Sequence, residues 1–316
     1  MGTQMAFWRN LKIGVRLGLG IGLVLGLLII VSGVAYLGLT TGNDHFSRYR
    51  SLARQTAAAG LINGDLLTAR LSVKDFLLKG SDESVAKVES AITTMQQDID
   101  ANAAILSASD AGKTLLDEVE DDAKAYHDGF KQVVDLFQQK ETYVKELDEL
   151  APKIEAELKA ISDNAFGSSD AALTYQAAGA LHDHFLARVY IDKFMLDNAP
   201  DEIQTVHDEF ALFDKQIAIV LGDAKPAAEQ QLAQDVAKLG KEYAAAFDKA
   251  EASIISRNDI INNTLNKIGP KMAAQVKGLV DANKAQQDEL GPIASAEIEE
   301  SLVVMLIVSG IVRISL

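Results

Sequence analysis

The sequence predicts an all-α protein with two stacked antiparallel four-helix bundles that share two long helices and are flanked by transmembrane helices. Three observations predict this fold. The 316 residues include only 5 prolines and 6% aromatic residues, so turn and strand formers are few. Between residues 44 and 300 apolar side chains recur at spacings of three and four, the period of an amphipathic helix. Uncharged apolar runs lie on both sides of this region.

The first apolar run, residues 17–39, has no charged residue and spans roughly 34 Å as a helix, enough to cross a bilayer. A cleavable signal peptide is the alternative, but its apolar core is typically about 7–15 residues long, so an uncleaved membrane helix is favoured. Basic residues precede this run and the first acid, Asp44, follows it, which predicts a cytoplasmic segment 1–16 and a body outside the inner membrane. The basic residues are Arg9, Lys12 and Arg16.

The second apolar run, residues 302–312, is too short to cross a membrane, which takes about 20 residues. It is either a short buried or interfacial tail or the start of a second transmembrane helix. We expect the second, over residues 301–316, because the run follows a long helical region and mirrors the first span. On this interpretation the chain stops inside that helix.

Breaker residues divide the region between the spans into six helices. Ser81 is expected to cap the second of them together with Ser84. Pro152, Pro270 and Pro292 are expected to kink the long helices without necessarily ending them. The expected helices cover about 44–79, 82–106, 111–166, 171–197 and 200–221, and from about 225 into the second span.

The region 44–300 also repeats itself at an offset of 118 residues. Chance alignment of two amphipathic helices is the alternative, but shared breakers and a shared Ala-Arg-x5-Phe-x-Leu pattern favour a duplication. The third and last helices are long enough to run through both halves, and short connections make neighbouring helices antiparallel. The identical pairs include Ala69 and Ala187, Arg70 and Arg188, Phe76 and Phe194, and Leu78 and Leu196.

This organisation resembles the helical bimodular (HBM) sensor domain of methyl-accepting chemotaxis proteins. The resemblance covers nearly the whole chain: a basic start, a first span, about 255 helical residues in two related halves, and the start of a second span. It rests on this combination and not on any single motif. It implies a periplasmic ligand-binding domain over residues 44–300.

The sequence offers little for catalysis. It has no cysteine, only 5 histidines and none of the GxSxG, HExxH or P-loop motifs, so we expect no enzyme activity, no metal site and no cofactor. His182 and His184 point roughly 200° apart on a helix and cannot share a metal. The net charge of −15 argues against a nucleic-acid partner.

Three arginines, Arg70, Arg188 and Arg257, each have apolar neighbours three and four residues away, so each is placed to point into a bundle. The expected threading brings all three towards mid-height, and Asn63 lies on the stripe of Arg70. Converging guanidinium groups need anions. The alternative is that they turn outwards or pair with helix carboxylates such as Asp65, Asp75 or Asp192. The resemblance implies that Arg70, Arg188, Arg257 and Asn63 bind a small organic acid, a di- or tricarboxylate.

We therefore interpret the chain as the extracytoplasmic sensing portion of a bacterial chemoreceptor in the inner membrane. Its expected partners are an organic acid, the membrane and a second copy in a homodimer. Ligand binding would displace the second span and pass the signal to a cytoplasmic module. Two alternatives remain open at this point: the sensor of a membrane histidine kinase, and a membrane-anchored helical protein without a ligand.

Overall fold

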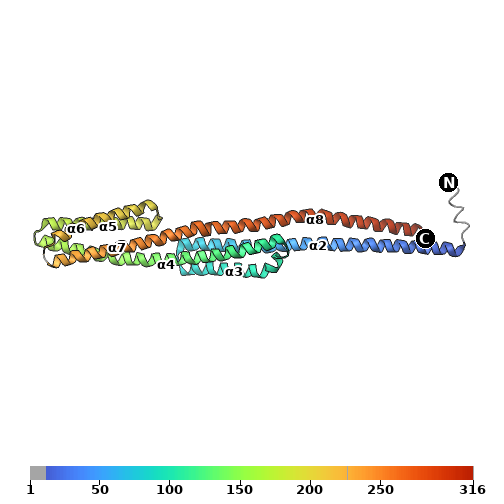
Figure 1. The fold of residues 1–316 in the computed structure, drawn as a ribbon, viewed down its shortest axis with the longest axis horizontal. Helices are drawn as coiled ribbons and strands as arrows, with labels where there is room; N and C mark the ends of the chain where they lie inside the picture. The colour runs from blue at the N-terminus through green and yellow to red at the C-terminus, as the bar shows by residue number, and fades with distance from the viewer. Residues whose placement is uncertain (1–11, 226, 316) are drawn as a thin grey trace. The chain divides into compact units, whose positions relative to one another are not determined.

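The computed structural model describes residues 12–225 and 227–315, and all regular elements in this part of the chain are helices (Figure 1). Residues 1–11 of the predicted cytoplasmic segment 1–16 lie outside the described residues. The side chains of residues 308–316, at the end of the predicted second span, also lie outside the described part of the chain. The elements are α2 (Ile13–Lys79), α3 (Asp82–Leu106), α4 (Asp110–Gly167), α5 (Ala171–Asp197), α6 (Pro200–Asp223), α7 (Ala227–Ile260), the π-helix η1 (Ile261–Leu265) and α8 (Asn266–Ser315).

The all-α prediction is confirmed, and the breaker residues locate most helix ends correctly. The expected bounds 82–106 and 171–197 are those of α3 and α5. Two expectations change. The first span and the helix after it form one continuous helix, α2, because no breaker separates them. The last expected helix is interrupted by η1, a single π-helical turn in which the N–H of Asn266 bonds back to the carbonyl of Ile261.

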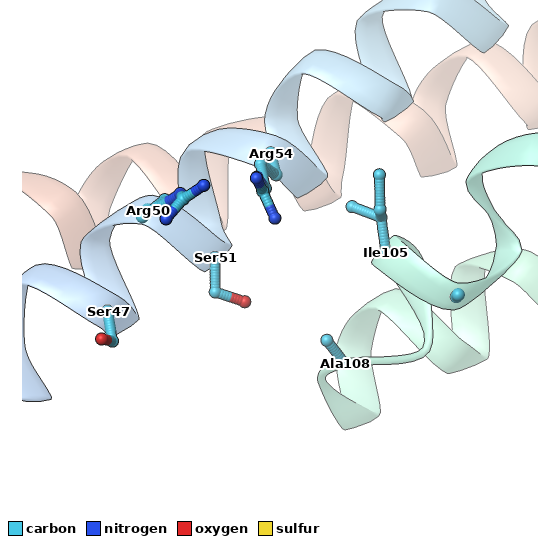
Figure 2. A pocket seen from close by; sticks show the side chains of 7 residues that line it. Ser47, Arg50, Ser51, Arg54, Ile105 and Ala108 are labelled. Carbon is cyan, nitrogen blue, oxygen red and sulfur yellow. The ribbon is translucent and has the colours of Figure 1, made fainter.

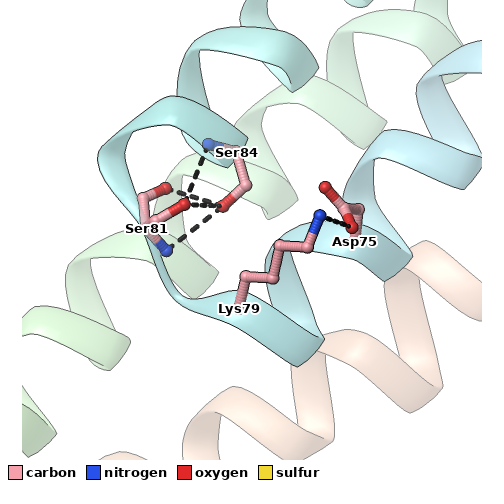
Figure 3. Close-up of polar contacts among 4 residues, drawn as sticks. All are labelled: Asp75, Lys79, Ser81 and Ser84. Atoms are coloured by element: carbon pink, nitrogen blue, oxygen red, sulfur yellow. Dashed lines mark hydrogen bonds and ion pairs between the residues drawn. The ribbon is translucent and has the colours of Figure 1, made fainter.

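The connection between α2 and α3 confirms the predicted cap (Figure 3). The backbone N–H of Ser84 donates to the Ser81 hydroxyl at 3.3 Å, and the N–H of Ser81 donates to the Ser84 hydroxyl at 3.2 Å. This is the reciprocal arrangement of a capping box, built from two serines. Gly80 precedes it with a φ of 61°, and a Cβ at this position would overlap the ring of Phe137. The turn therefore needs a glycine for both its backbone and its packing.

Inter-residue contacts divide the chain into two compact units. Unit 1 contains the described residues up to Lys74, Ala86–Ala123 and the described chain from Pro270. Unit 2 contains Asp75–Val85 and Lys124–Gly269. Each unit is built from long antiparallel helices, and the prolines inside α4 and α8 do not end those helices.

The core of unit 1 is formed by one face each of α2, α3, α4 and α8. Apolar residues of α2 are buried at alternating spacings of three and four, the stripe expected of a bundle helix. Polar contacts add to the packing of α4 against α8: Lys271 binds Asp122 at 2.9 Å, and Gln275 donates to Glu118 at 2.7 Å. The buried set includes Ile62, Leu66, Ala69 and Val73 on α2, Val88, Met95 and Ile99 on α3, Val119 on α4, and Met272 and Val276 on α8.

The core of unit 2 is formed by α4, α5, α6 and α7, and α5 and α6 form an antiparallel hairpin (Figure 1). Aromatic rings fill much of it: Phe194 and Phe247 meet edge to face at 5.8 Å, as do Phe210 and Tyr243 at 5.9 Å. Such pairs add to the stabilisation from burial. Aliphatic members of the core include Leu150, Ile154, Leu158, Ile161, Ile191, Val206, Ile217, Val220 and Val236.

The N-terminal part of α2 differs from both cores. An 18-residue window of this helix has a mean hydropathy of 2.6, and none of it is buried. An apolar helix of this length without buried side chains suggests a membrane anchor. Among the described residues α2 is the one helix that is long and apolar enough to cross a bilayer.

Candidate functional site

Arg257 lies on α7, four residues before η1, and forms no ion pair among the described residues. Its Nη2 donates to the side-chain oxygen of Asn198 at 3.2 Å and to that of Asn258 at 3.0 Å. Its Nε also donates to Asn258, at 3.3 Å. The arginine is half-buried, and all its hydrogen-bond partners among the described residues are neutral amides.

The surroundings of Arg257 favour an anion. Burial lowers the pKa of its guanidinium, which means that the site destabilises the positive charge. Neutral amide oxygens satisfy donors without neutralising that charge, whereas a carboxylate would do both. A half-buried cation held by amides therefore attracts a carboxylate more strongly than a fully solvated arginine does.

Local backbone structure fixes the position of Asn198. This residue ends α5 in the left-handed conformation, with a φ of 56°, and its N–H donates to the carbonyl of Phe194 at 2.8 Å. Asparagine tolerates this conformation better than most residues, which explains its place at the end of α5. One residue therefore terminates α5 and holds the Arg257 side chain on α7.

Arg188 on α5 has a different environment. Its Nη1 forms a salt bridge with Glu155 on α4, so a protein carboxylate already occupies the guanidinium. The side chain of His184, 2% exposed, lies 3.8 Å from the same carboxylate. Burial, and secondly the charge of Arg188, lower the pKa of His184 to about 4. An acid could bind Arg188 only by displacing Glu155 or by sharing the guanidinium with it.

Arg70 and Asn63 belong to unit 1, whereas Arg188 and Arg257 belong to unit 2. Both unit 1 residues are half-buried on α2. Arg70 forms no hydrogen bond or ion pair among the described residues. The predicted meeting of the three arginines stays a prediction, and so does their role in binding.

A basic pocket that sequence reasoning missed lies in unit 1 between α2 and the end of α3 (Figure 2). Its volume is about 350 Å³, the size of a small-molecule site. Arg50 and Arg54 are four residues apart and lie on one face of α2, opposite Ile105 and the loop that follows α3. Both guanidinium groups are exposed, so the pocket offers positive charge with less desolvation than Arg257. The remaining lining residues are Ser47, Ser51, Ala104 and Ala108.

The sequence carried one signal for this pocket, the basic cluster Arg48, Arg50 and Arg54 in an otherwise acidic region. Charge runs on helices are usually solvated faces, so the cluster alone did not distinguish a pocket from an exposed surface.

Comparison with known protein families identifies the family of the chain. Residues 10–180 match the model of a family described as a four-helix bundle sensory module for signal transduction. The chain belongs to this family. A comparison with curated proteins found no match. The sensory module covers α2, α3, α4 and the first part of α5, so the membrane helix, the basic pocket and Arg70 lie inside the matched region. Members of the family are signalling modules and generally not enzymes, in agreement with the absence of catalytic motifs from the sequence.

Proposed function

We propose that this sensory module is the extracytoplasmic sensing portion of a bacterial chemoreceptor, and that it binds a small organic acid with two or three carboxylates. The observation that carries the proposal is Arg257. It is a half-buried cation whose partners among the described residues are the amides of Asn198 and Asn258. A carboxylate of the ligand would replace these amides as the acceptor and neutralise the charge.

The other predicted residues enter the proposal with different weights. Arg70 has no hydrogen-bond or ion-pair partner among the described residues, so its guanidinium is available to an acid. Asn63 lies seven residues earlier on the same helix. Arg188 contributes only if Glu155 leaves the guanidinium, because the negative charge of Glu155 repels the carboxylate of a ligand. Arg257 is therefore the arginine that should dominate the affinity.

The membrane arrangement is part of the proposal. The exposed apolar helix over residues 17–39, preceded by basic and followed by acidic residues, supports an inner-membrane anchor with the body in the periplasm. A close approach of α8 to α2 supports a second span: a Cβ on Gly38 would lie 2.6 Å from the hydroxyl oxygen of Ser301. Small residues at such contacts are typical of membrane helix pairs. A displacement of α8 along α2 would carry the signal to a cytoplasmic module.

The bimodular form of the sensor is also proposed, on the basis of burial. Most of the apolar positions matched at the offset of 118 residues are buried at both members of the pair, as a duplication of one bundle would produce, although Phe210, the partner of the buried Ile92, is only partly buried. The buried pairs are Ala69 and Ala187, Phe76 and Phe194, Val88 and Val206, Met95 and Phe213, Ile99 and Ile217, and Ile154 and Met272.

Titration calorimetry of the full chain in lipid nanodiscs, against a panel of mono-, di- and tricarboxylates, tests the proposed function. We expect saturable binding of at least one di- or tricarboxylate and weaker binding of monocarboxylates that share its skeleton. A panel in which no acid binds, with the helical circular dichroism of a folded chain, would refute the organic-acid proposal. The sensor as such would then need another class of ligand.

A further inference from the structure

A histidine and two carboxylates meet on the surface of unit 2. His207 lies on α6, and its Nε2 is 3.3 Å from a carboxylate oxygen of Glu251 on α7. Its Nδ1 is 4.0 Å from an oxygen of Asp248 on the same helix. One ligand atom from each of the three residues lies within 4.8 Å of the other two.

The backbone and the aromatic core hold this cluster in place. Asp248 and Glu251 are three residues apart on α7, so both carboxylates point to the same side of the helix. The imidazole ring packs edge to face against Phe247 at 5.7 Å and Phe210 at 6.4 Å, and these contacts fix its orientation between α6 and α7.

We propose that His207, Asp248 and Glu251 bind a divalent transition-metal ion of the zinc class. Zinc ligands lie about 2.0–2.2 Å from the metal, so neighbouring ligand atoms in a tetrahedral site are roughly 3.3–3.6 Å apart. The separation of His207 Nε2 from Glu251 matches this spacing. Asp248 lies nearer Nδ1, and its side chain is 60% exposed, so the proposal requires this carboxylate to turn towards the ion at Nε2. Imidazole with two carboxylates suits zinc better than the hard ions calcium or magnesium.

A simple ion pair is the competing explanation, and the two differ in the positive charge that they supply to the carboxylates. An exposed ion pair gains little free energy, and one carboxylate is enough to make it. Here Glu251 approaches Nε2 of the ring and Asp248 approaches Nδ1. A protonated ring supplies one positive charge to this pair of carboxylates, whereas a divalent cation bound at Nε2 supplies two and relieves their repulsion more fully. A bound ion would join α6 to α7 and reduce the motion of one helix against the other.

Calorimetric titration of the tag-free full chain in nanodiscs with zinc chloride tests the site. We expect saturable binding of one zinc ion per chain. Both His207→Ala and Glu251→Gln should weaken that binding at least about 10-fold, because each removes a ligand. The control variant His182→Ala changes an exposed histidine of α5 outside the cluster and should leave the affinity unchanged.

Glu251→Gln preserves the size of the side chain, and circular dichroism verifies that both variants fold. Failure of zinc to bind, or equal zinc affinity in wild type, His207→Ala and Glu251→Gln, would overturn the proposal. Neither result bears on organic-acid binding, since these residues lie outside the arginine site.

Discussion

The buried imidazole of His184 gives unit 2 a defined response to acid. In the folded chain the ring packs against Tyr243 and Phe213, at 5.1 and 5.9 Å between ring centroids. It also hydrogen-bonds to the backbone of Ala151. Burial and the nearby Arg188 hold it neutral, with a pKa of about 4 instead of 6.5. The unfolded chain, in contrast, takes up a proton below pH 6.5.

The sign and size of the effect follow from this difference. The stabilisation is fully present above pH 6.5 and is lost as the pH falls towards 4, because the unfolded state binds the additional proton. At about 1.4 kcal/mol for each unit of pKa, the total loss is about 3.5 kcal/mol for the fall in pKa from 6.5 to about 4. This corresponds to a total decrease of roughly 300-fold in the ratio of folded to unfolded unit 2, of which roughly 100-fold falls between pH 6.5 and 4.

Hydrogen exchange followed by mass spectrometry measures this loss in the full chain, with peptides of α5 as the reporter of unit 2. Protection in wild type, corrected for the intrinsic exchange rate, should fall by roughly 100-fold between pH 6.5 and 4. The variant His184→Gln removes the titrating ring. Asp183 and Glu209, whose pKa values are raised, titrate in both chains, so the difference between the two pH profiles reports the contribution of His184 alone. Identical pH profiles for wild type and variant would refute this explanation.

Two further predictions concern unit 1 and the α2–α3 turn. Burial, a hydrogen bond with Asp98 and the charge of Asp98 raise the pKa of Asp65 to about 6, so ionisation of this carboxyl destabilises unit 1 above that pH. The stabilisation by the protonated carboxyl is fully present below pH 3.8 and is lost as the pH rises to about 6, so Asp65→Asn should increase the protection of α3 at pH 7 and have little effect below pH 3.8. A gain independent of pH would contradict this cause. Gly80→Ala should lower the free energy of unfolding by about 1–3 kcal/mol in urea titrations, because the left-handed backbone and the Phe137 ring both oppose a Cβ. Gly60→Ala, in an open position of α2, is the control and should raise it by about 0.5–1 kcal/mol; equal effects of the two changes would contradict the packing argument.

The helices could be predicted from the sequence because their ends depend on local chemistry. Gly80 and Ser81 stop one helix and cap the next, and Asn198 and Pro200 do the same between α5 and α6. The π-turn η1 was not predictable in this way. Its sequence contains no breaker, and the additional residue is accommodated by packing, with Thr264 close to Gly129 of α4.

The candidate site could be predicted only in part. Helical spacing placed Arg70, Arg188 and Arg257 on apolar stripes, and each is half-buried, but their role in binding stays a prediction. Spacing says nothing of partners on other helices. Glu155, which neutralises Arg188, and Asn198, which holds Arg257, come from distant parts of the sequence and meet their arginines only in the folded bundle.

The His207 cluster escaped the sequence analysis for the same reason. Its histidine and its carboxylates lie on α6 and α7, and no metal-binding motif has that spacing. The basic pocket of Arg50 and Arg54 is similar, because its arginines were visible in the sequence while its opposite wall at Ile105 was not.

The most direct test of the central claim compares wild type with Arg257→Ala in a calorimetric titration of the full chain with the tightest-binding acid of the panel. The account predicts that the variant loses about 1.5–3 kcal/mol of binding free energy, the range for a hydrogen bond to a charged group. Arg48→Ala, a control at an exposed arginine of α2, should bind as wild type does. Equal affinity in wild type and Arg257→Ala would contradict the account.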